Sequence, residues 1–225
     1  MFGFRLQPLS GLTVAADGEL GRQDRPFFPV ADKDYHALSG RVLYRKQRFA
    51  ASATARAAYN FNTVGLSAHS ARARTYTADA SWQQNAWMSV EGGYSKLHSD
   101  TASWLAYFAS GSAVTGASSL WLSNIHAVNI SANFAIGPRV SASLGYSRTE
   151  DTGGTLPGAA QPAAVFAPAQ QYPMVFQSPL ARLSVKLTEK IRWNAGYQYY
   201  GYSEDLMPTL NYRAHTGYTS LLWTF

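Results

Sequence analysis

The chain has 225 residues, of which 14% are aromatic and 14% charged, with no cysteine and a formal net charge of +6. The charged fraction is well below the ~25% of soluble domains, and the lack of cysteine excludes disulfides, thiolate metal sites and a thiol nucleophile. Because the basic residues are scattered and form no Lys/Arg-rich run, nucleic acid is excluded as a predicted partner.

Segments in which apolar and polar residues alternate follow one another along the whole chain. This period of two predicts β-strands, because successive side chains of a strand point to opposite faces. A partial strand is predicted at 2–6, followed by ten full strands at 12–21, 35–45, 49–61, 72–82, 87–98, 120–136, 140–147, 181–187, 191–199 and 211–225. No run of about 18 apolar residues occurs, so no transmembrane helix is predicted, but a barrel strand crosses a membrane with only about 10 alternating residues.

Short and long connections alternate strictly between these strands. The short ones begin near Pro8, Lys46, Gln83, Gly137 and Thr188, and the long ones near Arg22, Asn62, Ser99, Glu150 and Ser203. In an up-and-down meander, all connections of one kind lie at the same end. Tight turns at one rim and long loops at the other are typical of outer-membrane barrels, whose short turns are periplasmic. The sequence therefore predicts an all-β, transmembrane, antiparallel up-and-down β-barrel.

The last predicted strand carries its aromatic residues at the extreme end of the chain. Leu221, Trp223 and Phe225 share its apolar face, and Phe225 is the final residue. This ending resembles the closing strand of bacterial outer-membrane β-barrels, whose terminal aromatic residue is recognised by the barrel-assembly machinery. The resemblance implies a location in the bacterial outer membrane, that machinery as a partner, and these three residues as the assembly signal.

Aromatic residues are predicted to form two girdles at the edges of the lipid bilayer. Those near the short turns are Phe49, Trp82, Phe134, Trp193, Trp223 and Phe225, and those toward the long loops are Tyr59, Tyr76, Tyr94, Tyr146 and Tyr199. The stretch from Phe49 to Tyr59 spans about 25 Å on a tilted strand, which is the height of the apolar band. A soluble β-sandwich is the competing interpretation, but sandwiches do not sort Trp and Tyr to opposite ends.

The polar face of the strands is predicted to line a lumen. Its middle residues are small, such as Ser52, Ser143 and Gly196, which suits a wide, wet lumen or one occupied by a plug or partner. The predicted lumen-lining charges are Arg41, Arg45, Arg56, Asp79, Glu91, Arg182, Lys186 and Arg192. Their basic excess would favour anions, although the same arginines could instead ring the rim for structure or contact lipopolysaccharide.

A Gly-Tyr pair recurs near the middle of three predicted strands, at Gly93-Tyr94, Gly145-Tyr146 and Gly196-Tyr197. A glycine weakens a strand unless something covers the gap, and a neighbouring tyrosine ring can do so. The recurrence suggests that the chain grew by duplication of hairpins.

No catalytic constellation is found in the sequence. The five histidines lie in separate segments without metal-ligand spacing, and no Gly-x-Ser-x-Gly motif occurs. We therefore expect neither an enzyme nor a cofactor, and predict a porin-like channel for passive passage of small solutes, anions among them. A barrel-borne hydrolase assembled across strands stays an alternative.

The chain is predicted to be one β-barrel domain over residues 1–225, or the C-terminal segment of a larger barrel, without a separate soluble domain. The N-terminus lacks the pattern of an export signal, and ten strands plus a partial one leave the strand number open. The turn-and-strand style of 5–14 and 76–96 loosely resembles barrels that enclose multihaem cytochromes (MtrB/PioB type), which implies a sheath around a periplasmic or extracellular protein. The barrel of a TonB-dependent transporter is a further alternative.

Overall fold

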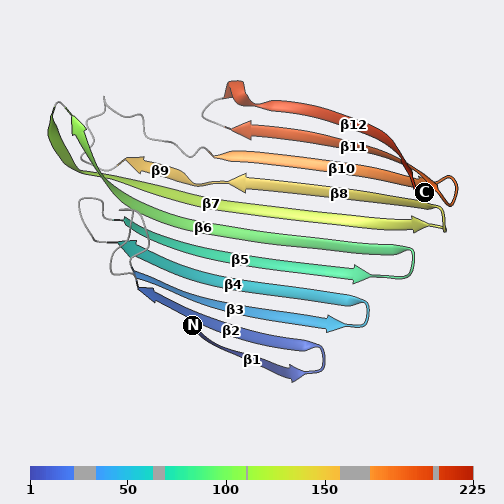
Figure 1. The fold of residues 1–225 in the computed structure, drawn as a ribbon, viewed down its shortest axis with the longest axis horizontal. Coiled ribbons are helices and arrows are strands. Elements are labelled where there is room, and N and C mark those ends of the chain that lie inside the picture. Colours follow the sequence, from blue (N-terminus) through green and yellow to red (C-terminus); the bar gives the residue numbers. More distant parts are fainter. Residues whose placement is uncertain (23–33, 63–68, 110, 158–172, 205–207, 225) are drawn as a thin grey trace.

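The protein forms a single antiparallel β-sheet (Figure 1). The computed structural model describes residues 1–22, 34–62, 69–109, 111–157, 173–204 and 208–224. Neighbours in the sheet follow the order β1-β2-β3-β4-β5-β6-β7-β8-β10-β11-β12, and the short β9 pairs with β7. The predicted all-β meander is therefore confirmed.

Most strand bounds agree with the predicted ranges to within a few residues, but β10 begins at Met174 rather than at 181 and β11 ends at Glu204 rather than at 199, and further additions are described below. They are β1 (Phe2–Leu9), β2 (Leu12–Arg22), β3 (Asp34–Lys46), β4 (Phe49–Asn62), β5 (His69–Gln83), β6 (Met88–Ala109), β7 (Ser112–Ile136), β8 (Val140–Asp151), β9 (Gly154–Pro157), β10 (Met174–Lys186), β11 (Ile191–Glu204) and β12 (Tyr212–Trp223). A 3-10 helix, η1 (Pro208–Leu210), precedes β12. Within the described ranges, no helix is long and apolar enough to cross a bilayer.

The short connections all lie at one end of the sheet (Figure 1). Gly11 and Gly137 adopt left-handed backbone angles there, with φ of 83° and 78°. The first turn is Ser10-Gly11 rather than a turn starting near Pro8, because β1 continues to Leu9. Proline lacks the N–H that a ladder needs, and the register shifts at this place, between Leu6 and Leu9.

The segment 99–119, predicted to be a long loop, is instead a continuation of β6 and β7. The two strands stay paired as far as Ala109 and Ser112, and the ribbon turns beside Gly111, whose φ is 79°. The sequence of this segment does not alternate clearly between apolar and polar residues, so it was interpreted as a loop. A strand shows such alternation only where one of its two faces lies in an apolar environment. Part of the loop predicted from Glu150 is likewise strand β9, while its residues 158–172 lie outside the described ranges.

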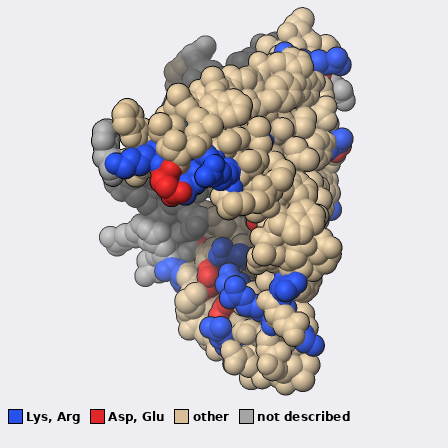
Figure 2. Space-filling view, turned by 90° about the vertical axis from the view of Figure 1, so that its right-hand side faces the viewer, with Lys and Arg blue, Asp and Glu red and all other residues tan. Residues whose placement is uncertain are grey.

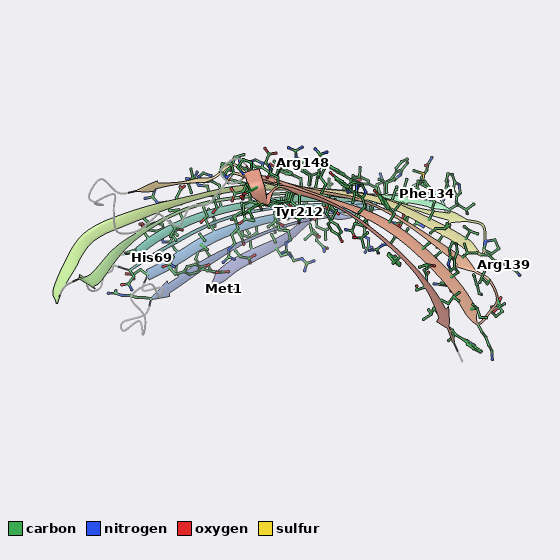
Figure 3. The ribbon with its side chains drawn as sticks, turned by 90° about the horizontal axis from the view of Figure 1, so that it is seen from above. Met1, His69, Phe134, Arg139, Arg148 and Tyr212 are labelled. Atoms are coloured by element: carbon green, nitrogen blue, oxygen red, sulfur yellow. The ribbon has the colours of Figure 1, made fainter. Side chains whose placement is uncertain are left out.

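Residues of similar polarity lie opposite one another on neighbouring strands, so the sheet has one apolar face and one polar face. One face carries, for example, Val42, opposite Val14 on β2 and Ala53 on β4, while the next residue, Leu43, is opposite Thr13 and Ser52. The sheet is curved, and Figure 3 shows Phe134 and Arg148 of the first face on the convex side. The convex face is apolar over most of its height and the concave face is polar.

The sheet has no core of the kind found in soluble domains. Among the described residues, Ala37 is the only buried hydrophobic side chain, whereas Leu221 and Trp223 on the convex face are 69% and 64% exposed. An apolar surface of this extent is unfavourable in water and is typical of a face that a membrane or another protein covers.

The described residues form an open arc rather than a closed barrel. The strands β1 and β12 are the two edges of the sheet and make no contact with each other. Closure, which the sequence analysis predicted, is therefore not seen in this part of the chain.

We expect the Gly11→Ala variant to lose more stability than Gly137→Ala. A left-handed backbone angle costs an alanine about 1 kcal/mol at either position. At Gly11 the added Cβ would also lie 2.1 Å from the main-chain oxygen of Arg45, whereas at Gly137 it would meet nothing within 4 Å. Urea unfolding of the protein in lipid vesicles measures the difference, and equal losses would show that the first turn can relax without cost.

Candidate functional site on the concave face

A hollow of about 570 Å³ lies on the concave face, toward the short turns. Its polar lining includes Ser89, Asn133, Ser143, Arg182, Asn194 and Tyr218, which come from β6, β7, β8, β10, β11 and β12. Figure 2 looks at the short-turn end and shows a recess in the sheet, with Lys, Arg, Asp and Glu side chains around it. The hollow is therefore a surface of the sheet that water and small polar molecules can reach.

Arg182 is the charged residue of this hollow. In register it lies between Ser143 of β8 and Gly196 of β11. Its side chain is exposed, and it forms no ion pair with any carboxylate in the described part of the chain. A guanidinium in this position can donate to carboxylate, phosphate or hydroxyl oxygens of a solute.

Small residues flank Arg182 in register. Gly196 is covered by the ring of Tyr218 from β12, which would lie 2.2 Å from a Cβ at that position. The expected cover by a neighbouring tyrosine is therefore seen at Gly196, although the ring comes from the adjacent strand, because Tyr197 points to the opposite face. Gly93 and Gly145 instead face Asp79 and Leu180.

The eight predicted lumen-lining charges all lie on the concave face by register, but the fold does not bring them together. They fall into three groups, which are Arg41, Arg45 and Arg56 on β3 and β4, Asp79 and Glu91 on β5 and β6, and Arg182, Lys186 and Arg192 on β10 and β11. Their role in solute passage stays a prediction.

Two of these cations are already paired with carboxylates. Arg56 Nη2 lies 3.0 Å from Glu19 Oε2, which also accepts a hydrogen bond of 2.9 Å from the Tyr35 hydroxyl. Lys186 Nζ lies 2.7 Å from Glu189 Oε2 in the adjacent turn. Neither side chain therefore offers an unpaired charge to an anion.

Sequence reasoning missed several concave-face residues that alter the charge balance. They are the acids Asp17, Glu19, Asp151 and Glu204. Asp17 and Glu19 could have been found from the alternation of β2, but the other two occupy segments that were taken for loops. Because of these acids, the concave face is mixed in charge rather than strongly basic.

An aromatic patch also lies on the concave face. It lies at the long-loop end of β10, β11 and β12, where the rings of Tyr202 and Tyr212 stack with centroids 5.5 Å apart and those of Phe176 and Tyr200 lie 6.2 Å apart. The sequence contained one sign of this patch, since Tyr200 and Tyr202 occupy the alternate positions of the strand that point away from its apolar face.

The predicted girdle residues lie on the convex face by register, apart from Phe225, which lies outside the described residues. Phe49 pairs directly with Trp82, and Trp223 with Ile191, near the short turns. Leu221 and Trp223 of the predicted assembly signal are on the same face. Their contacts with lipid and with the barrel-assembly machinery stay predictions.

The described residues contain no group of three or more His, Asp or Glu side chains that could hold a metal ion. Four of the five histidines lie on the convex face, each on a different strand and beside polar or aromatic neighbours.

The fold matches solved structures of outer-membrane receptors. The ferric preacinetobactin receptor BauA from Acinetobacter baumannii superimposes with a TM-score of 0.60 at 10% identity, covering 97% of this chain and 41% of the receptor. The alcaligin outer membrane receptor FauA from Bordetella pertussis gives 0.61 at 12% identity, with 99% and 37% coverage. No family model and no curated protein matches the chain.

These likenesses show an outer-membrane β-barrel fold, of which the chain spans about two fifths of each receptor. The fold supports the bacterial outer-membrane location predicted from the sequence. The resemblance to barrels that enclose multihaem cytochromes stays a prediction.

Cysteine substitutions on β8 test the assignment of the two faces, since the chain has no native cysteine. Ser143 borders the hollow, and the adjacent Leu144, which is outside its lining, belongs to the convex face. We expect a membrane-impermeant maleimide to label Ser143→Cys in vesicles and to leave Leu144→Cys unlabelled, because lipid shields the convex face. Both should react after denaturation, and labelling of Leu144→Cys in intact vesicles would contradict the assignment.

Proposed function

We propose that the chain forms a wall segment of an outer-membrane β-barrel that lets small polar solutes cross the membrane along its concave face. The observation that carries this proposal is the continuous polar surface with its hollow of about 570 Å³, opposite a convex face that needs lipid. Small side chains at the middle of this surface leave room for water, as in wide barrels. The proposal includes no catalytic step.

Solute preference in this proposal is local. The concave face as a whole is mixed in charge, so it gives no strong field for anions. Arg182, however, is exposed and faces the hollow without an ion-pair partner among the described residues. We infer that this arginine contributes most of any preference for anionic solutes.

A second candidate is an uptake receptor, in which the lumen is occupied by a plug. It is favoured by the match to the ferric preacinetobactin and alcaligin receptors over 97% and 99% of this chain. The aromatic patch at the long-loop end would then lie at the entrance, where rings can stack on a planar ligand. A receptor would take up a bound ligand but would give no steady conductance.

Planar-bilayer recordings separate the two candidates. An open channel gives discrete conductance steps, and we expect Arg182→Glu to shift the reversal potential toward cation preference, with a smaller shift for the uncharged Arg182→Gln. Arg182→Lys serves as a control, because it keeps the positive charge at this position and should leave the reversal potential nearly unchanged. A folded, vesicle-inserted protein whose barrel is closed and that never conducts would exclude the channel and leave the receptor.

A further inference from the structure

The convex face carries a cluster of cations at its long-loop end. We call it the basic belt, and it consists of Arg72 and Arg74 on β5, Lys96 on β6 and Arg148 on β8. The belt borders the apolar part of the same face, which continues along β5 through Ala78 and Ala80 to Trp82. Arg72, Arg74 and Arg148 are exposed, and Lys96 is half-buried.

Few carboxylates on the convex face neutralise these cations. Asp100 lies 3.3 Å from His98 Nε2, and Glu150 lies 2.9 Å from Arg148 Nη2. Arg74 and Lys96 form no ion pair with any carboxylate that the structure describes. The four cations of the belt therefore outnumber the two carboxylates beside them. The belt has an excess of positive charge even when the nearby His98 and His126 are neutral.

Tyrosines flank the belt on the side of the apolar band. Arg72 lies opposite Tyr59, with its guanidinium carbon 5.2 Å from the ring centroid, and Lys96 lies opposite Tyr76. Tyr94 hydrogen-bonds His126 at 2.8 Å, between Lys96 and Arg148 along the sheet. Because tyrosine prefers the boundary between hydrocarbon and headgroups, the belt lies at headgroup depth.

The two ends of the convex face differ in the placement of their cations. At the short-turn end the face shows the aromatic residues Phe49, Trp82 and Phe134, while Arg48, Arg139 and Lys190 lie in the turns themselves. A lipid-facing cation costs about 2–4 kcal/mol at the middle of the bilayer and about 0–1 near the interface. A belt within the strands thus calls for an anionic headgroup beside it.

We propose that the basic belt binds the phosphate groups of lipopolysaccharide in the outer leaflet. The long loops of outer-membrane barrels are extracellular, so the belt faces the leaflet that holds this glycolipid. Guanidinium groups bind phosphate through two parallel hydrogen bonds, and the ammonium of Lys96 adds a point charge. The site rests on the outer-membrane location and does not depend on what passes through the lumen.

This placement changes the lipopolysaccharide expectation drawn from the sequence. That expectation concerned the arginines predicted to line the lumen, among them Arg41 and Arg45. The register places Arg41 and Arg45 on the concave face, away from lipid. Arg72 and Arg74 pair with residues of the convex face and therefore face outward. The residues that contact the glycolipid are therefore a different set.

Binding of purified lipid A to the protein in detergent micelles tests the proposal. We expect the triple variant Arg72→Gln, Arg74→Gln, Lys96→Gln to bind bisphosphorylated lipid A about a hundredfold more weakly, since each cation near an anionic surface contributes about fivefold. The matched control, Arg48→Gln, Arg139→Gln, Lys190→Gln, removes the same charge from the short-turn rim and should bind as the unmodified protein does. Retention of the heat-resistant folded band on gels shows that each variant is folded.

Two further arms make the result decisive. Replacing Arg72 and Arg74 by lysine should preserve most of the binding, and lipid A stripped of its phosphates should bind unmodified protein and triple variant equally weakly. Equal loss in the belt and control variants would overturn the proposal. Equal affinity for phosphatidylglycerol and for lipid A would also overturn it, because the belt would then be a general anionic-lipid surface.

Discussion

Antiparallel hydrogen bonding between consecutive strands is the interaction on which the whole structure depends. It fixes the register, and the register carries one set of alternating side chains across eleven strands to a single apolar face. In lipid no water is present to satisfy main-chain groups, so the ladder must bond them all. Where the ladder ends, at β1 and β12, a membrane requires further strands from some source. The single-layer sheet, its exposed leucines and its lack of a core all follow from this arrangement.

The alternation that the ladder imposes made most of the fold predictable from the sequence. Wherever one side of a strand faces lipid, as along 49–61, the apolar positions recur with a period of two and the strand is visible. The outer part of β6 and β7 lacked this signal, because a ribbon beyond the bilayer has no apolar environment to select side chains on one face. Closure could not be predicted either, since it depends on which strand lies beside β12 and not on any local pattern.

The candidate site was only partly visible in the sequence for the same reason. The alternation along each strand identified charged residues of the concave face, such as Arg182. It did not show which of these charges are neutralised by an ion pair. That depends on contacts between distant residues, as between Arg56 and Glu19, which are 37 positions apart. The basic belt was not predicted, because its residues lie near the ends of the predicted strands, at positions that belong to the mainly apolar face. Only the register shows that they lie side by side on one surface.

The connectivity of the sheet also sets the order in which it can form. Each strand pairs with the next one along the chain, apart from the step from β8 to β10 over β9, so every pairing joins strands that are close in the sequence. Closure entropy grows slowly with loop length, by about 0.6 kcal/mol for each doubling, and local pairing is fast for a β-protein. The sheet can therefore grow as a zipper, one hairpin at a time, with each finished strand as the template for the next. The outer sides of β1 and β12 are the only strand sides that gain no partner from this order of pairing among the described residues.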